Sequence, residues 1–386
     1  MNMQTNITSA RLEYTAFVEA LTNSCKIIEK RTSVDILKTV HIKAMRNGVR
    51  VTGTDLDIYT AKFVPGDVTR DFECIIDANK FLNTIKKVKA SSHVMLVKEE
   101  SRVVAVIGGL NLDLKHDHDT SDFPVADQEG SFRYAIERSN CSFKISSTQL
   151  HKALSKVAPS ISTEETRYYL NGVYMHIPDH SNQLTFAATD GHRLARYEVP
   201  APDGSEAMPD AGVIIPRKTI IELLRLLGRK SCPESTLITV ADIGVSFLVG
   251  EDEVLESKAI NGKFPDYIRV IPTGNDHPVA AMASDMIAGI KQASAILSES
   301  KQVNLHLRPE ALSFTCTDKD FGSATTDIVA FNKTDLLIGF NCEYLLAMLT
   351  LIDGDVKMLF GDAGTPALFM DTKDDAVTYV LMPVRV

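Results

Sequence analysis

The chain carries three copies of one short pattern, an apolar strand-like run that ends in Thr-Asp. The aspartates of the three copies are Asp55, Asp190 and Asp318, which lie 135 and 128 residues apart. This spacing is the size of a domain and is much longer than the roughly 20–50 residues of a solenoid repeat. Because each copy is long enough to bury a core of its own, the pattern predicts three similar domains in tandem.

Each copy also predicts two amphipathic helices, one before and one after its Thr-Asp pair. Apolar residues recur close to the helical period in residues 11–31, 79–90, 144–157, 217–230, 283–301 and 341–353. Apolar runs between turn residues, such as 103–107, 237–240 and 376–381, predict strands. The chain is therefore expected to have an α+β fold, with two helices packed on antiparallel sheets in each domain. We expect the domains to be residues 1–135, 140–272 and 273–386, with boundaries in the polar segments near 128–130 and 273–276.

The composition is typical of a folded globular protein. Of the 386 residues, 44% are hydrophobic and 24% are charged. The longest apolar stretches, such as 345–352, are far shorter than the roughly 20 residues of a membrane span, and residues 1–5 show no signal-peptide pattern. We therefore expect a cytoplasmic protein. The six cysteines are widely spaced, which is not typical of a disulfide framework or a zinc site.

Positive charge is concentrated in the six predicted helices, although the net charge of the chain is −9. The helices carry ten more basic than acidic residues, which leaves −19 for the rest, and windows 79–90 and 217–230 are the most basic. Such helices are either ordinary solvated faces or a surface that faces DNA phosphates. Attraction to phosphate would be independent of base sequence and sensitive to salt. The third domain departs from the trend, since its two helices sum to −2.

The second copy of the Thr-Asp pattern resembles a motif of a known family. Residues 187–195, Ala-Ala-Thr-Asp-Gly-His-Arg-Leu-Ala, are similar to the corresponding segment of the bacterial DNA sliding clamps, the beta subunits of DNA polymerase III. Further segments that resemble the family occur in the family's order along the whole chain. They are residues 53–56, 122–124, 167–172, 215–218, 262–267, 338–341 and 379–386.

The resemblance implies a closed ring. Two chains would join head to tail as a homodimer of six domains, with helices inside, sheets outside and duplex DNA threaded through the hole without sequence preference. The implied partners are the replicative polymerase, the clamp loader and other clamp-binding proteins, with no catalytic residue, cofactor, metal or membrane. The residues that it implies at the DNA are Arg31, Lys80, Lys86, Lys87, Arg167, Tyr168, Tyr169, Arg217, Arg225 and Arg229. Those that it implies at the dimer contact are Leu112, Ile296 and Leu297.

The family also has a hydrophobic cleft between its middle and last domains, where short peptide motifs of replication proteins dock. Aliphatic and Met side chains would receive Leu or Phe anchors, while Arg, His and Asn would orient the peptide. The resemblance implies that one wall consists of Leu170, Thr189, Gly191, His192, Arg193, Leu194, Pro265, Arg269 and Val270. It implies that the other consists of Asn341, Tyr344, Val380, Leu381, Met382, Pro383, Val384 and Arg385.

Four residues depart from the family's pattern. Asp35 replaces a frequent proline, and Gln302 replaces an aromatic residue that often borders the cleft. Glu164 and Glu165 stand beside the implied DNA loop, where carboxylates repel phosphate. These departures predict weaker local attraction to DNA and a different fit of partner peptides.

Two other functions remain open from the residues alone. A tandem-repeat scaffold that binds proteins but not DNA would keep the cleft and leave the basic helices unexplained. A metal-dependent hydrolase would need a metal site, for which residues 116–119, His-Asp-His-Asp, with Asp122 are the best candidate. The chain has no Walker loop, G-x-S-x-G elbow, H-E-x-x-H motif or paired-glycine dinucleotide motif.

Overall fold

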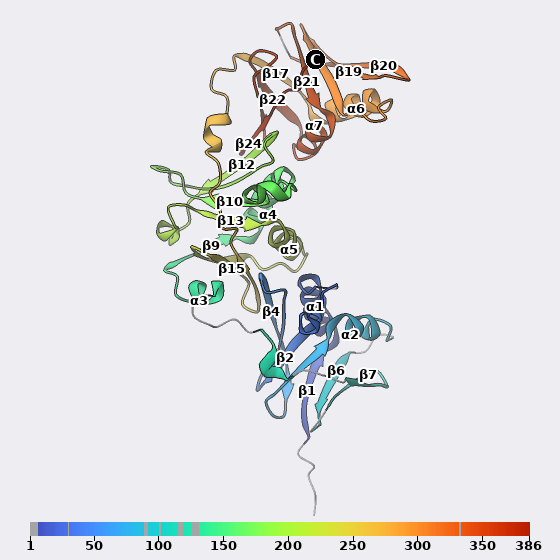
Figure 1. Ribbon diagram of the computed structural model, residues 1–386, viewed down its shortest axis with the longest axis vertical. Coiled ribbons are helices and arrows are strands. Elements are labelled where there is room, and N and C mark those ends of the chain that lie inside the picture. Colours follow the sequence, from blue (N-terminus) through green and yellow to red (C-terminus); the bar gives the residue numbers. More distant parts are fainter. Residues whose placement is uncertain are drawn as a thin grey trace, which may run out of the picture. The chain divides into compact units, whose positions relative to one another are not determined.

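The computed structural model describes residues 7–29, 31–88, 92–99, 102–114, 119–124, 131–331 and 333–386. The chain forms two compact units, whose elements are labelled in Figure 1. Unit 1 contains residues 1–148, 203–207 and 221–259, and unit 2 contains residues 149–202, 208–220 and 260–386. The middle repeat therefore contributes to both units. The boundary expected near residues 128–130 lies outside the described residues.

Six of the described α-helices coincide with the six predicted windows, although α2 begins one residue before its window. The α-helices are α1 (Tyr14–Ile27), α2 (Ala78–Ile85), α3 (Phe132–Glu137), α4 (Ser147–Val157), α5 (Arg217–Leu227), α6 (Ala283–Ser294) and α7 (Cys342–Leu349). Short 3-10 helices are η1 (Asp35–Lys38), η2 (Thr120–Asp122), η3 (Ala158–Ser160), η4 (Glu165–Leu170), η5 (Ser205–Ala207) and η6 (Tyr267–Val270). α3 was not predicted, because its six residues are too few to show a helical period. In the described chain, no helix is both long enough and apolar enough to cross a membrane.

The strands of unit 1 that the structure describes form one antiparallel sheet. They are β1 (Thr8–Glu13), β2 (Thr39–Met45), β3 (Gly48–Thr54), β4 (Ile58–Val68), β5 (Phe72–Asp77), β6 (His93–Lys98), β7 (Val103–Ile107), β8 (Leu110–Leu114), β9 (Cys141–Ser146), β14 (Ser235–Ala241), β15 (Gly244–Val249) and β16 (Glu253–Lys258). Their order is β8-β7-β6-β1-β4-β16-β15-β14-β9, with β3, β2 and β5 continuing from β4. α1 packs on β3 and β4 and lies beside α2 (Figure 1). Phe17 and Leu21 of α1 are fully buried, as their spacing predicted.

Unit 2 contains two antiparallel sheets. The larger sheet has the order β13-β10-β11-β12-β24-β23-β22-β17 and the smaller has the order β20-β19-β18-β21. The strands are β10 (Gly172–His176), β11 (Gln183–Thr189), β12 (Arg193–Pro200), β13 (Val213–Pro216), β17 (His277–Met282), β18 (Gln302–Arg308), β19 (Ala311–Asp318), β20 (Gly322–Val329), β21 (Leu336–Asn341), β22 (Asp355–Phe360), β23 (Ala367–Asp371) and β24 (Asp374–Leu381). α6 packs on β19 and β20 and lies beside α7 (Figure 1).

The three Thr-Asp pairs form the same turn. In each copy one carboxylate oxygen, Oδ1, accepts the backbone N–H groups of the residues two and three positions later. For Asp55 these distances are 3.0 and 2.7 Å, for Asp190 they are 2.9 and 3.0 Å, and for Asp318 both are 3.1 Å. A carboxylate that accepts its own downstream N–H groups closes a tight turn, which explains why aspartate recurs at this place.

The strand that follows each of the first two turns joins two repeats edge to edge. In unit 1, β4 pairs with β16, so that Thr60 lies opposite Leu255. In unit 2, β12 pairs with β24, so that Ala195 lies opposite Tyr379. Each pairing is between a strand of one repeat and the last strand of the next repeat along the chain. The sheets therefore run continuously through both of these joints.

The helices are shorter than the predicted windows, and this changes the distribution of charge. The six helices as observed carry eight basic and four acidic residues. Lys86, Lys87, Arg229 and Lys230 lie just beyond the helix ends, so the excess of ten found in the windows is partly an excess in the flanking turns. Ile221 belongs to the apolar pattern of residues 217–230 but is 51% exposed, so it does not contribute to the core.

Candidate functional site

The turn between β11 and β12 forms one edge of the candidate cleft. Thr189 Oγ1 donates to the Arg193 carbonyl at 2.7 Å and accepts the Gly191 N–H at 3.1 Å. Gly191 has a φ of +89°, which favours glycine. Asp190 Oδ2 accepts Arg193 Nε at 3.0 Å. These bonds leave His192 exposed at the tip and hold the guanidinium of Arg193 in a fixed direction.

Pairing of β12 with β24 brings together predicted residues of both walls. Leu194 lies opposite Val380, and Arg193 lies opposite Leu381. Leu170, Leu194 and Val380 share one buried apolar cluster, which also contains Phe264 and Tyr267. The aliphatic floor of the site is therefore part of the core of unit 2, which keeps it rigid.

α7 supplies the second edge. Asn341 caps the helix, since its Oδ1 accepts the N–H groups of Glu343 at 2.9 Å and Tyr344 at 3.3 Å. The cap directs the first turn of α7 so that the Tyr344 ring stacks with the His192 ring, with 6.1 Å between ring centres. The Asn341 amide oxygen is thus engaged in the cap of the helix.

The last residues of the chain run across the site. We call Met382–Arg385 the terminal segment. The Met382 N–H donates to the His192 carbonyl at 2.8 Å, and the Val384 N–H donates to the Gly339 carbonyl on β21 at 2.9 Å. The terminal segment is therefore fastened to the β11–β12 turn at one end and to the smaller sheet at the other. Met382 is 40% exposed, so an apolar side chain is presented between the two attachments.

A small pocket opens between these parts. It is lined by Pro159, Ser160, Arg193, Leu194, Tyr344, Met348, Leu351, Tyr379, Val380 and Leu381. Five of these, Pro159, Ser160, Met348, Leu351 and Tyr379, were not predicted. Met348 and Leu351 follow Tyr344 at helical spacing, so the period of α7 could have identified them. Pro159 and Ser160 reach the pocket through packing alone, for which the sequence carries no local signal.

The remaining predicted residues of the first wall lie on the segment around η6. Phe264 and Tyr267 anchor this segment in the apolar cluster, while Pro265, Arg269 and Val270 are exposed. Tyr267 Oη is 2.9 Å from Nε2 of His176 on β10, and burial lowers the pKa of His176 to about 4. The imidazole is therefore neutral at physiological pH and acts as a packed hydrogen-bonding partner that fixes the segment.

Ion pairs lie beneath the joint of β12 and β24. Lys152 Nζ is 2.8 Å from Asp374 Oδ2, and Lys156 Nζ is 3.2 Å from Asp371 Oδ2. The hydrogen bond to Asp374 raises the pKa of Lys152, so this lysine stays charged. Burial and the neighbouring carboxylates raise the pKa of Tyr379, so its phenol stays protonated. These two lysines of a predicted DNA-facing helix are engaged within the fold.

Six of the predicted DNA-binding residues are exposed cations. They are Arg31, Lys80, Lys86, Lys87, Arg167 and Arg217. Lys80 Nζ lies 3.1 Å from Asp77 Oδ2, although most of its side chain remains exposed. Pairs of this exposed kind contribute little stability, so the ammonium group remains free to exchange partners.

Arg225 and Arg229 differ from the expectation. Arg229 Nη1 pairs with Glu19 and Nη2 with Glu253, and the Arg229 side chain is 19% exposed. Arg225 Nε donates to Glu222 at 2.8 Å, and its Nη1 donates to Asn23 at 3.0 Å. Arg229 thus belongs to the joint between β4 and β16, since Glu253 lies on β16. Its charge is already neutralised by two carboxylates. Arg225 is partly engaged in the same way.

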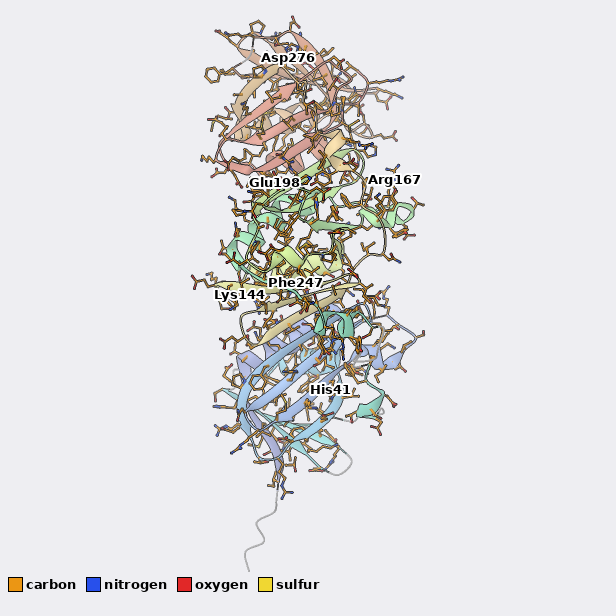
Figure 2. All side chains as sticks on the ribbon, turned by 90° about the vertical axis from the view of Figure 1, so that its left-hand side faces the viewer. His41, Lys144, Arg167, Glu198, Phe247 and Asp276 are labelled. Atoms are coloured by element: carbon orange, nitrogen blue, oxygen red, sulfur yellow. The ribbon has the colours of Figure 1, made fainter. Side chains whose placement is uncertain are left out.

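The loop that carries Arg167, Tyr168 and Tyr169 projects from unit 2, and Figure 2 shows Arg167 on this projecting segment. Arg167 Nε lies 3.4 Å from Glu164 Oε2. Its partner is therefore one of the two glutamates that differ from the family's pattern. Tyr168 is 54% exposed. A Cβ on Gly191 would lie 2.8 Å from Arg167 Nη1, which places the guanidinium against the turn of the cleft.

The predicted dimer residues lie near strands that end the sheets of the described chain. Leu112 is on β8, an end of the unit 1 sheet, and is half-buried. Ile296 and Leu297 follow α6 and are half-buried. Ser298, the next residue, donates from N and Oγ to Asp318 Oδ2 at 3.0 and 2.6 Å. This places the two aliphatic residues beside the turn that leads into β20, the end of the smaller sheet of unit 2.

Within the described residues, no three His, Cys, Asp or Glu side chains are arranged to hold a metal ion. Residues 116–118 of the candidate metal site lie outside this part of the chain. Asp119 is described, and its carboxylate accepts the Ser121 N–H at 3.0 Å as the cap of η2.

Three family models match the chain in order. They describe the N-terminal domain of the DNA polymerase III beta subunit over residues 8–127, its central domain over residues 144–266 and its C-terminal domain over residues 268–385. The three-domain organisation predicted from the repeat is confirmed.

Relatives of known name agree over nearly the whole length. The chain is 34% identical to the Beta sliding clamp of Caulobacter vibrioides, with 97% of this chain and 99% of the relative covered. It is 28% identical to that of Pseudomonas aeruginosa, with 93% and 95% covered.

Solved structures show the same fold. A DnaN sliding clamp from Bartonella birtlesii, solved with griselimycin bound, has a TM-score of 0.91 at 33% identity and covers 98% of this chain and 100% of its own. A Caulobacter crescentus beta sliding clamp, solved with polyethylene glycol at the region suggested to tether the beta motif, has a TM-score of 0.91 at 31% identity, with 98% and 99% covered. The repeated turns, the two joints and these matches together show that the chain belongs to the DNA polymerase III beta subunit family, the bacterial DNA sliding clamps.

Proposed function

We propose that two copies of this chain close into a ring around duplex DNA, and that the cleft of unit 2 holds peptide segments of the replicative polymerase and of other proteins that work on DNA. The ring is proposed because the same edge-to-edge joint occurs twice within the chain, as β4 with β16 and as β12 with β24. The equivalent strands that remain, β20 and β8, each end a sheet of the described chain. No catalytic step is part of this function, and the ring would act in the cytoplasm.

The repeat determines which strands meet between copies. β4 and β12 follow the first two Thr-Asp turns. Each pairs with the last strand of the next repeat, β4 with β16 and β12 with β24. β20 follows the third turn and ends its sheet, and β8 is the last described strand of the first repeat and ends its own. Unpaired strand edges favour association with another chain. Pairing of β20 with β8 of a second copy repeats the same joint, and two such contacts close the assembly head to tail.

The segments after the helices support the same arrangement. In unit 2, Pro159 and Ser160, which follow α4, line the pocket beside Tyr379 of β24. Ser160 is the fourteenth residue counted from the start of α4, and Ile296 is the fourteenth counted from the start of α6. Ile296 would therefore lie against β8 of the other copy, where Leu112 is found. Burial of each such aliphatic side chain stabilises the contact by about 1.5–3 kcal/mol.

The exposed cations are the residues that we propose to face the DNA. Arg31, Lys80, Lys86, Lys87, Arg167 and Arg217 have exposed side chains. Contacts of exposed lysine and arginine with phosphate are individually weak and are screened by salt. Such contacts cannot by themselves hold an acidic protein on DNA, so retention comes from closure of the ring. A clamp loader is then required to open one joint.

The cleft is the proposed site for partner peptides. Its floor is aliphatic, its rim carries Arg193, His192 and Asn341, and Tyr344 stands at the mouth. An apolar pocket with a few oriented polar groups is suited to a short peptide with Leu or Phe anchors. The Bartonella birtlesii relative was solved with griselimycin bound. We propose that this compound binds the present chain in the same cleft.

The test compares circular with linear DNA. The protein is loaded on nicked circular DNA, and retention is followed by gel filtration before and after the circle is cut. We expect retention in moderate salt on the circle and rapid loss from the cut molecule, because a ring runs off free ends. The Ile296→Ala, Leu297→Ala double variant should be a folded monomer by light scattering and should be retained on neither.

Three outcomes separate the alternatives. Equal retention on circular and linear DNA would show an open basic surface and would refute the ring. Binding of a Leu-Phe peptide without retention on either DNA would favour the tandem-repeat scaffold. Removal of Met382 to Val386 should abolish peptide binding while leaving the dimer intact, and unchanged peptide affinity would refute the cleft.

A further inference from the structure

A glutamine side chain holds the terminal segment from the side of the smaller sheet. Gln302 Nε2 donates to the Arg385 carbonyl at 3.0 Å and to Asn304 Oδ1 at 2.8 Å. A primary amide has two N–H groups, so both bonds are made at once and orient the side chain. Gln302 is half-buried at the start of β18, where it lies opposite Asn341 on β21. The amide thus connects the end of the chain to the strand that leads into α7.

A glycine makes room for this arrangement. A Cβ on Gly339 would lie 2.9 Å from the Val384 carbonyl oxygen, 3.2 Å from Asn304 Oδ1 and 3.2 Å from Gln302 Nε2. Any side chain at this position would press on all three groups. Gly339 also accepts the Val384 N–H. We refer to Gln302, Asn304 and Gly339 together as the latch, because they fasten the terminal segment flat against β18 and β21.

We propose that Gln302 is a positioning residue of the peptide cleft, which fastens the terminal segment and thereby sets the place of Met382 and the preference among apolar anchors. This inference rests on the proposed peptide-binding function. Met382 lies between the bond to His192 and the latch, so it cannot shift outward without breaking one of them. A phenylalanine side chain at position 302 could make neither of the two donated bonds.

The latch has two consequences for binding. A wall that is already ordered loses less conformational entropy when a ligand binds, which increases affinity. A wall in a fixed position also excludes anchors that are too large, whereas a released wall can move to admit them. Loss of the latch should therefore weaken binding of a well-fitting anchor more than binding of a bulky one.

The experiment uses the full-length dimer and two fluorescent acetylated hexapeptides that end in Leu-Phe or in Leu-Trp. Gln302→Leu keeps most of the bulk of the side chain and removes both donors. Loss of about 1 kcal/mol from these hydrogen bonds corresponds to about fivefold weaker binding of the Leu-Phe peptide. The Leu-Trp peptide should lose less than twofold. Gln302→Glu, which cannot donate, should behave like Gln302→Leu.

A truncated chain distinguishes positioning from direct contact. Truncation after Pro383 keeps Met382 but removes the carbonyl that Gln302 holds. In this background Gln302→Leu should change neither affinity, because there is nothing left to fasten. An equal loss in the truncated chain would mean that Gln302 touches the peptide, and it would overturn the proposal. Unchanged affinity and selectivity of full-length Gln302→Leu would overturn it as well.

Failure of the underlying function gives a different result. If truncation after Leu381 leaves the affinity for the Leu-Phe peptide unchanged, the cleft itself is not the peptide site. Gel filtration and far-ultraviolet circular dichroism show whether each variant is a folded dimer. Asn304→Asp, which keeps an acceptor for Gln302, is the matched control and should retain the selectivity of the unchanged chain.

Discussion

The guanidinium carbon of Arg193 lies 4.4 Å from the centre of the Tyr344 ring. The same guanidinium is held by Asp190 at 3.0 Å, and the ring is also stacked with His192. The tip of the β11–β12 turn and the first turn of α7 are therefore fastened to each other. The Tyr344 ring, which lines the pocket, is thus held in place by two neighbours on the turn.

Tyr344→Ala should weaken peptide binding about tenfold. It removes the ring surface and the cation–π contact with Arg193, which is worth about 0.5–2 kcal/mol. Tyr344→Phe keeps the ring and should bind within about twofold of the unchanged chain. Fluorescence anisotropy with the Leu-Phe peptide measures both. Full affinity of the alanine variant would mean that the ring does not contact the ligand.

A disulfide should form between protomers at the register that the repeat predicts. Thr60 and Ala195 are the fifth residues after Asp55 and Asp190, and they lie opposite Leu255 and Tyr379. Ser323 is the fifth residue after Asp318, so it should lie opposite the equivalent residue of β8. That residue is Leu112. Its pair with Ala105 lies two residues from the end of the β7–β8 hairpin, just as the pair of Leu255 with Phe247 lies two residues from the end of the β15–β16 hairpin.

Leu112→Cys with Ser323→Cys should therefore give covalent dimers on a non-reducing gel after mild oxidation. Asp113→Cys with Ser323→Cys is the control, because neighbouring residues of a strand point to opposite faces. Equal cross-linking of the two pairs would contradict this register. The native cysteines are buried except Cys232, which is half-buried, so each single variant serves as background.

Glu253→Ala should destabilise unit 1 by about 3–5 kcal/mol. The Glu253 side chain is 1% exposed and pairs with Lys62 at 3.2 Å and with Arg229, so its removal leaves these two cations with Glu19 as their shared carboxylate and one positive charge uncompensated. Urea unfolding followed by circular dichroism measures the loss. The matched control is Glu343→Ala, which breaks a pair in which both side chains are more than half exposed and should cost less than about 1 kcal/mol.

Replacing Lys86 and Lys87 together by Ala should reduce loading on DNA and flatten its dependence on salt. Each phosphate contact contributes about one unit to the slope of log affinity against log salt concentration, so the slope should fall by about 2. Release after the circle is cut should be unchanged. The Lys373→Ala variant, which removes an exposed lysine paired with Asp353, is the control, and an equal effect there would show that only net charge matters.

The Asp318 turn should respond to acid. Hydrogen bonds from Ser298, and from the backbone of residues 320 and 321, lower the pKa of Asp318 to about 2 from its usual 3.8. Because the folded-state pKa is depressed, the stabilisation is complete above pH 3.8 and is lost as the pH falls through about 2. Asp318→Asn should flatten the fall in stability between pH 4 and 2, as measured by urea unfolding. An unchanged acid limb would mean that other carboxylates dominate it.

The sequence was most informative where a local pattern repeats. The Thr-Asp pairs predicted strands that end in turns, and all three carboxylates make the same two backbone bonds. The spacing of apolar residues located six helices, but not their ends, because capping by residues such as Asp77 or Asn341 depends on backbone geometry. The resemblance located most of the cleft, and Pro159 was missed because only packing brings it there.

Counting charges along the sequence could not reveal ion pairs between residues that are distant in the chain. Arg229 looked like a cation of a DNA-facing helix, yet its partner Glu19 is 210 residues away in the chain. No window of sequence can show such a pair. The same limit applies to Lys152 and Lys156, whose partners Asp374 and Asp371 belong to the third repeat.

The helix faces at the joints differ in charge, and this affects how the protein should move on DNA. At the sixth position of α1, α4 and α6 stand Glu19, Lys152 and Ala288, and at the tenth stand Asn23, Lys156 and Gln292. In the proposed ring, the seam between protomers would therefore carry no charge at these two positions, and salt would scarcely weaken its apolar contacts and main-chain bonds. Rising ionic strength should loosen the hold on phosphate before it opens the seam. Within that range of salt, one-dimensional diffusion along the duplex should become faster while the residence time on a closed circle stays the same.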